Sequence, residues 1–177
     1  SIASGGNYNV VVGDEAGTAL TTGDENVAVG YNALATEDTG VGNVAVGRNA
    51  LTALNFDGNG YNTAVGYVAG AAVTTGTNNT LIGAQAGDAL TDADFNTAVG
   101  HKALTADTLG SRNTAVGRSA LQAQNFTTAT NSYNTAVGYA AGGAVTTGVL
   151  NTLVGGLAGD ALTSGNNNVA VGYLALS

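Results

Sequence analysis

The side chains that could perform acid–base chemistry are few in this chain of 177 residues, which has one histidine, His101, and no cysteine. General acid–base or nucleophilic catalysis needs a second group at a defined position, and no serine, cysteine or second histidine is paired with His101 at a fixed spacing. Similar segments of the chain have Tyr31, Arg48 or Ala84 at the place of His101. We therefore expect this histidine to face solvent.

The carboxylates do not indicate an active site either. A glycosidase needs two carboxylates on either side of a cleft. Asp88 and Asp160 occupy equivalent places, but they are 72 residues apart in a regular structure. Asp-Gly-Asn-Gly at residues 57–60 faintly resembles a calcium turn, yet its counterpart at residues 127–130 has no carboxylate. We predict a protein that is not an enzyme, with no catalytic residue, no cofactor and no metal.

One motif organises the whole chain. Asn-(Val/Thr)-X-(Val/Ile)-Gly occurs ten times at intervals of 17 residues, apart from one interval of 19 and one of 21. A fixed period of this length is typical of a solenoid, in which each unit contacts only its neighbours. The ten motifs begin at Asn9, Asn26, Asn43, Asn62, Asn79, Asn96, Asn113, Asn134, Asn151 and Asn168.

A longer period of four coils lies on top of the first. Residues 62–91 and 134–163 agree at most positions. Two coils of each block have Ala-Leu after the motif, and the next two have Ala-Gly with a large apolar residue three positions later. We infer a tandem duplication, with blocks at about 26–95 and 96–167, inside one domain over residues 1–177. Because the chain starts at Ser1 without methionine and stops inside a motif, we expect a fragment of a longer fibre.

The motif itself predicts the local structure. Val, Thr and Ile favour the pleated conformation, and the closing glycine permits a sharp bend. Each coil should therefore contain a strand, a bend, a second short strand and a polar turn. Parallel pairing at about 4.8 Å gives a rod roughly 45–50 Å long. The predicted fold is an all-β parallel β-solenoid, or β-roll, of about ten 17-residue coils, in which the recurring asparagines form a structural ladder.

Composition excludes several partners. Charged residues make up only 9 % of the chain and the net charge is −8, which argues against a nucleic-acid partner. No apolar run is long enough for a membrane-spanning segment. The absence of cysteine does not decide the compartment, because backbone ladders need no disulfide.

Both faces of the predicted strand are apolar. The fourth motif position is Val or Ile in every coil, and the third is Ala, Val or Leu. A strand that is apolar on both sides is normally buried on both sides, and one narrow coil covers only one of them. We expect the second face to meet another copy of the chain. The alternative is a monomeric three-sided β-helix with its alanine face exposed.

The segments NVAVGYNAL, NTAVGYVAG and NTAVGHKAL resemble the head repeats of trimeric autotransporter adhesins. This resemblance covers all ten coils and implies a homotrimer of left-handed parallel β-rolls. It would place Ala28, Val29, Ala64 and Val65 in the roll interior and around the three-fold axis. Similar NTAVGY-type repeats also occur in phage tail fibres. The longer coil and the two insertions depart from the adhesin pattern, and residues 1–177 contain no segment with a coiled-coil or membrane-anchor pattern.

The two longer coils are the most specific functional signal. Loops that project from a rigid scaffold are frequent sites of recognition, and an aromatic side chain there could stack on a sugar or contact a protein. The alternative is that these rings fold back onto the roll. Both insertions contain Asn-Phe and end in Tyr, so the candidate receptor-contact residues are Asn55, Phe56, Asp57, Tyr61, Asn125, Phe126 and Tyr133.

These observations favour a structural or adhesive segment of an extracellular fibre, on a bacterial surface or in a phage tail. Its partners would be further copies of the chain and a host-cell glycan or protein receptor, with no nucleic acid and no membrane insertion. One alternative is a filament subunit that stacks end to end. Another is a solenoid that binds ice or another ordered surface through the threonines at the second motif position.

Overall fold

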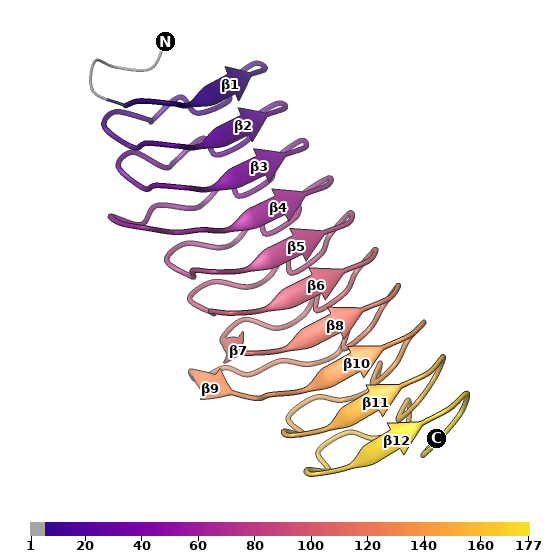
Figure 1. The fold of residues 1–177 in the computed structure, drawn as a ribbon. Helices are drawn as coiled ribbons and strands as arrows, with labels where there is room; N and C mark the ends of the chain where they lie inside the picture. Colours follow the sequence, from indigo (N-terminus) through magenta and orange to yellow (C-terminus); the bar gives the residue numbers. More distant parts are fainter. Residues whose placement is uncertain (1–5) are drawn as a thin grey trace.

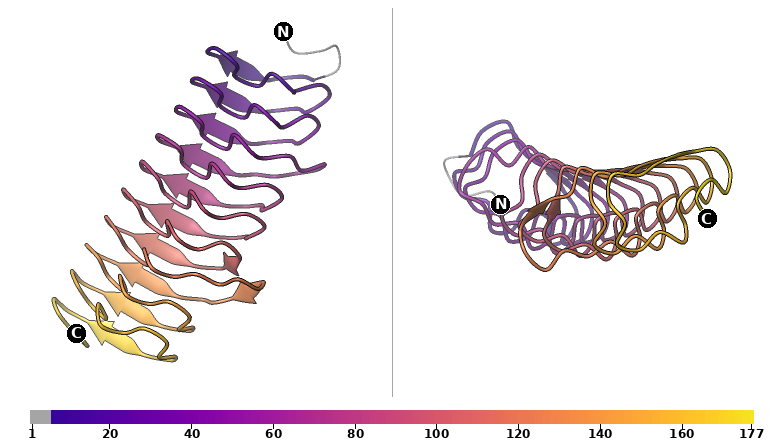
Figure 2. Two further views of the ribbon diagram at one scale, coloured as in Figure 1. Left: turned by 180° about the vertical axis from the view of Figure 1, so that it is seen from behind. Right: turned by 90° about the horizontal axis from the view of Figure 1, so that it is seen from below.

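The computed structural model describes residues 6–177, which form a stack of coils around one continuous core (Figure 1). Each coil contributes one three-residue strand to a ten-stranded parallel sheet. Seen from behind, the strands lie on one side of the rod and the connecting loops on the other (Figure 2). In their order across the sheet, the strands are β1 (Val10–Val12), β2 (Val27–Val29), β3 (Val44–Val46), β4 (Thr63–Val65), β5 (Thr80–Ile82), β6 (Thr97–Val99), β8 (Thr114–Val116), β10 (Thr135–Val137), β11 (Thr152–Val154) and β12 (Val169–Val171).

The register of the sheet follows the motif without interruption. The second motif residue of each coil pairs with the second residue of the next, also across the two insertions, where Val44 pairs with Thr63 and Thr114 with Thr135. In the second insertion, β9 (Thr130–Asn131) pairs in parallel with β7 (Gly110–Ser111) of the preceding coil, and in the first insertion Asn59 forms a single bridge to Val41. The prediction of an all-β parallel solenoid of about ten 17-residue coils is confirmed.

The second short strand predicted in each coil is not formed. Residues after the bend are turns, because alternate residues adopt a left-handed backbone conformation: Asn32 has φ 57° and Leu34 has φ 51° in one coil, and Lys102 and Leu104 repeat this pattern. A strand needs negative φ throughout. The chain therefore curls inward after the strand and directs apolar side chains such as Leu34 into the core.

The core explains the four-coil period. In four coils the middle strand residue is a fully buried alanine and a fully buried leucine six positions later fills the interior, as Ala98 and Leu104 do. In the coil of β5, Leu81 takes the central place and the residue six positions later is Gly87. A Cβ on Gly87 would lie 2.8 Å from Leu81 Cδ2. The two arrangements fill one narrow space in alternative ways, as close-packed interiors require.

The alanine face of the strands is inside the coil. Ala28, Ala64 and Ala115 have no exposed surface, whereas the neighbouring Val29, Val65 and Val116 are half-buried and point outward. The monomeric alternative with an exposed alanine face is therefore wrong about which face is covered. The outward face is formed by the second and fourth motif residues.

Candidate functional site: the outer face of the sheet

The outer face of the sheet consists of two regular columns of side chains. Strand residues alternate between the two sides of a sheet, so the buried middle residue leaves the first and third strand residues outside. Threonine occupies the first position in six successive strands, β4 to β11. The third position, which we call the Val/Ile column, contains Val12, Val29, Val46, Val65, Ile82, Val99, Val116, Val137, Val154 and Val171.

Two further columns border this face. The leading column is the residue before each motif asparagine, and it includes Tyr61, Phe95, Arg112, Tyr133 and Leu150, all exposed. The trailing column is the residue after the closing glycine. Its members are Asp14, Tyr31, Arg48, Tyr67, Ala84, His101, Arg118, Tyr139, Gly156 and Tyr173.

Arginine and aromatic rings stack on each other along the trailing column. The Arg48 guanidinium carbon lies 5.6 Å from the ring centroids of both Tyr31 and Tyr67. Arg118 lies 5.6 Å from the Tyr139 ring. Each arginine also donates a 3.4 Å hydrogen bond to a tyrosine hydroxyl, Arg48 to Tyr67 and Arg118 to Tyr139. These contacts restrict the guanidinium groups at the protein surface.

The leading column has a similar arrangement. Arg112 lies 4.7 Å from the Phe95 centroid and 5.9 Å from that of Tyr133. Its Nε donates a 3.2 Å hydrogen bond to Asn131 Oδ1, so the second insertion helps to hold this arginine. Tyr61 and Tyr133, which the sequence places at the ends of the insertions, thus belong to a regular column beside the strands.

The structure separates the candidate receptor-contact residues into two groups. Asn55, Asp57 and Asn125 are exposed, as are Tyr61 and Tyr133. Phe126 is only 8 % exposed, and Phe56 is half-buried against the core. The two phenylalanine rings therefore fold back onto the roll, whereas the polar residues of the loops and both tyrosines are accessible to a partner.

Two buried carboxylates that we did not single out from the sequence anchor the insertions. Glu37 accepts hydrogen bonds from the backbone N–H of Gly40 (2.7 Å) and Phe56 (3.2 Å). Asp107 accepts one from the N–H of Phe126 (2.9 Å) and another from the Gln124 amide (2.6 Å). Both carboxylates are fully buried. The sequence does mark these two acids by their position. The residue eleven positions after the motif asparagine is Leu or Val in most coils, but it is Glu37 or Asp107 in the coil before each insertion.

Burial raises the pKa of Glu37, and its backbone hydrogen bonds offset only part of this. A carboxyl whose folded-state pKa is raised contributes most stability below its unfolded pKa, about 4.3. That contribution is lost as the pH rises through the folded-state pKa. Between the unfolded-state and the folded-state pKa of Glu37, we expect wild type to lose stability relative to Glu37→Gln as the pH rises. The loss is about 1.4 kcal/mol for every pH unit between these two pKa values.

Urea unfolding of both proteins at a series of pH values measures this difference. Asp57→Asn, a change at an exposed carboxyl of the insertion that Glu37 anchors, serves as the control. A stability difference between wild type and Glu37→Gln that stays constant from pH 3 to pH 8 would contradict the assignment.

The motif asparagines close each coil and connect it to the next. Their side-chain oxygens accept the backbone N–H of the next motif asparagine at 2.8–3.2 Å. Most of their amide nitrogens donate to a carbonyl fourteen residues later, as Asn96 Nδ2 does to Gly110 O at 2.9 Å. Five of the amides also donate to the side chain of the preceding asparagine. The ladder is therefore a structural element of the core.

The two carboxylates considered for catalysis, Asp88 and Asp160, lie in coils that are four positions apart along the stack. His101 is exposed in the trailing column. Asp88 accepts a 2.6 Å hydrogen bond from Thr105. Within residues 6–177 no group of three or more His, Asp or Glu side chains could hold a metal ion. The same part of the chain contains no helix long and apolar enough to cross a membrane.

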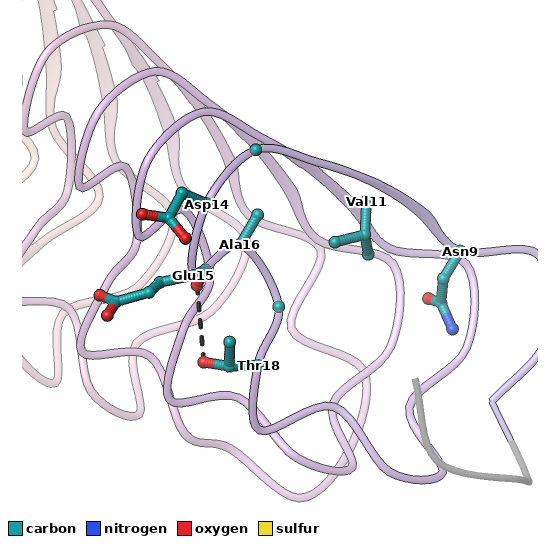
Figure 3. Close-up of a pocket in the computed structure, with 8 residues that line it drawn as sticks. Asn9, Val11, Asp14, Glu15, Ala16 and Thr18 are labelled. Atoms are coloured by element: carbon teal, nitrogen blue, oxygen red, sulfur yellow. Dashed lines mark hydrogen bonds between the residues drawn. The ribbon is translucent and has the colours of Figure 1, made fainter. Parts of the chain in front are cut away.

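A hollow of about 500 Å³ lies at the first coil (Figure 3). Asn9, Val11, Asp14, Glu15 and Thr18 line it, and Thr18 donates a 3.5 Å hydrogen bond to the Glu15 carbonyl. Because all its lining residues belong to one coil, the hollow is a feature of that coil and not a groove along the rod.

The surface with the most regular chemistry is thus the outer sheet face with its two borders. Near the start of the trailing column, the Glu15 carboxylate accepts a hydrogen bond from the Tyr31 hydroxyl and raises the pKa of that phenol.

No protein-family model, no curated protein sequence and no solved structure matches this chain.

Proposed function

We propose that this chain is a non-enzymatic rod segment of an extracellular fibre, which associates as a homotrimer and presents its borders and loops for attachment. The observation that supports this most is the exposed apolar outer face. The Val/Ile column continues over all ten coils: its interior valines are half-buried, Ile82 exposes 39 % of its surface, and Val12 and Val171 in the two edge strands expose 58 % and 69 %. A continuous apolar strip of this kind marks an interaction surface.

A second copy of the chain fits this strip better than a dissimilar partner. The column repeats with the same spacing as the coils, so an identical chain in axial register offers the same apolar group at each level. Within one chain the parallel sheet is covered only on its inner face. Parallel sheets are normally covered on both faces. The resemblance to trimeric adhesin heads supports three copies around a common axis.

Light scattering of the purified chain tests the proposal. We expect a mass near three times 17.1 kDa. Val99→Asp combined with Val116→Asp should give single chains, because two carboxylates per chain would have to be buried in the interface. Thr147→Asp, at an exposed turn, is the matched control and should leave the trimer unchanged. A wild-type mass of one chain would rule out the trimer.

A solenoid that binds an ordered surface such as ice is the second candidate. Its support is the unbroken threonine column from β4 to β11, which lies beside the Val/Ile column on the same face. Thermal hysteresis from a single-chain species would favour this function over the fibre. The filament that stacks end to end would instead give a large mass that depends on concentration.

A further inference from the structure

The positive charges of this acidic protein are concentrated beside the sheet. The chain has 12 acidic residues and only four cationic ones. Arg48, Arg112 and Arg118 all belong to the two border columns, and from Arg48 onward neither column contains a carboxylate. Among residues 6–177 none of these guanidinium groups is paired with a carboxylate. The borders are therefore a local cationic surface on a protein with a net charge of −8.

The trailing arginines are held ready to bind. Stacking on Tyr31 and Tyr67 restricts Arg48, and stacking on Tyr139 restricts Arg118. A guanidinium has five N–H donors, and each of these two uses one on a tyrosine hydroxyl. The other donors face solvent, because both arginines are exposed. A restricted arginine loses less conformational entropy when it binds an anion.

The arrangement is repeated along the rod. Arg48 and Tyr67 lie in the coils of β3 and β4, and Arg118 and Tyr139 lie in the equivalent coils of β8 and β10, four coils further on. Four coils correspond to about 19 Å. One small anion can occupy only one of these sites, whereas an extended anionic polymer parallel to the rod can occupy both, with a gain from multivalency.

We propose that the trailing column binds an extended acidic polysaccharide, with its carboxylates on Arg48 and Arg118 and its sugar faces on Tyr67 and Tyr139. This inference rests on the proposed adhesive function and names its ligand class. Tyrosine rings stack on the apolar faces of sugars, and arginine pairs with carboxylates through two parallel hydrogen bonds. Duplex DNA carries one charge per about 1.7 Å of its axis, so the net charge of −8 opposes it more strongly than a polymer with one carboxylate per sugar.

Affinity electrophoresis and calorimetry with polygalacturonate test the proposal, with the fully methyl-esterified polymer as the neutral match. We expect wild type to bind the acidic polymer, less tightly as salt increases, and not the ester. Arg48→Gln combined with Arg118→Gln should weaken binding at least tenfold, since charge-assisted hydrogen bonds are lost at both sites. Tyr139→Ala should weaken it less, because only one stacking platform is removed.

Lys102→Gln, which removes one positive charge outside the trailing column, is the control for the single variant Arg118→Gln. Lys102 follows the trailing column by one residue, and side chains at its position contact residues of the connecting loops: Gln85 donates to Asp88 at 3.5 Å and Asn32 donates to Thr52 at 2.8 Å. We expect this variant to bind the acidic polymer within about twofold of wild type. A circular-dichroism melt of each variant verifies that it is folded, which exposed sites should permit.

Three results would overturn the proposal: equal binding of the acid and its ester, wild-type binding by the double arginine variant, or tighter binding of single-stranded DNA by the same arginines. The mass measured on the same samples separates this inference from the proposed function. If the protein is a trimer but does not bind polygalacturonate, the proposed fibre function stands and the proposed polysaccharide site is wrong.

Discussion

Asn96→Ala is expected to lower the free energy of unfolding by about 2–6 kcal/mol. The Asn96 side chain satisfies two backbone groups: its oxygen accepts the N–H of Asn113 at 3.0 Å, and its amide donates to Gly110 O at 2.9 Å. The side chain is only 1 % exposed, so water does not replace either bond. Each buried polar group left without a partner costs about 1–3 kcal/mol.

Chemical denaturation of Asn96→Ala beside wild type measures this loss, and Asn125→Ala provides a control of the same chemistry. Asn125 is exposed at the second insertion, so its truncation should change the unfolding free energy by no more than about 0.5 kcal/mol. If the two variants lost the same small amount, the ladder would not be a main source of stability.

Gly87→Leu should destabilise the coil of β5 by about 2–5 kcal/mol, although leucine occupies the equivalent position in five other coils. The backbone does not forbid the change, because Leu104 has φ 55° where Gly87 has φ 54°. Space forbids it: the new Cβ would lie 2.8 Å from both Leu81 Cδ2 and Leu90 Cδ1. Overpacking in a close-packed core typically costs about 1–3 kcal/mol, and a left-handed side-chain-bearing residue adds about 1–2 kcal/mol.

A second substitution should recover part of that loss. Leu81→Ala alone removes a fully buried leucine and should cost about 2–5 kcal/mol. Leu81→Ala with Gly87→Leu recreates the pattern of the coil of β3, where Ala45, Leu51 and Leu54 are buried together. The double variant should therefore lose clearly less than the sum of the single losses in a thermal melt. Strict additivity would show that the two residues do not share one space.

The repeat, the strands and their parallel order could be predicted from the sequence because each depends on local properties. The motif returns at one period, so every strand has a neighbour with the same residues and the same preferred register. The buried asparagine at the start of each strand is part of this pattern, and its ladder follows once identical coils are stacked.

Other features could not be read from the chain alone. Ala98 and Val99 are both apolar, and only closure of a narrow coil decides that the smaller one fits inside. The second strand fails because Asn32 and Leu34 adopt left-handed conformations, which the preference of neighbouring residues does not reveal. The anchoring role of Glu37 and Asp107 depends on backbone N–H groups of Phe56 and Phe126 in the following coil, a pairing that local sequence does not reveal.

The sequence by itself thus determined the stacking direction and the positions of the strands, since these follow from a periodic pattern of short-range preferences. The tertiary structure alone decided which face is covered, how the two insertions are anchored, and that arginine and aromatic side chains from successive coils stack in columns. The physical reason is separation along the chain. Arg48 and Tyr67 are 19 residues apart in sequence, and the Arg48 guanidinium contacts the Tyr67 ring only because the coils pair in register.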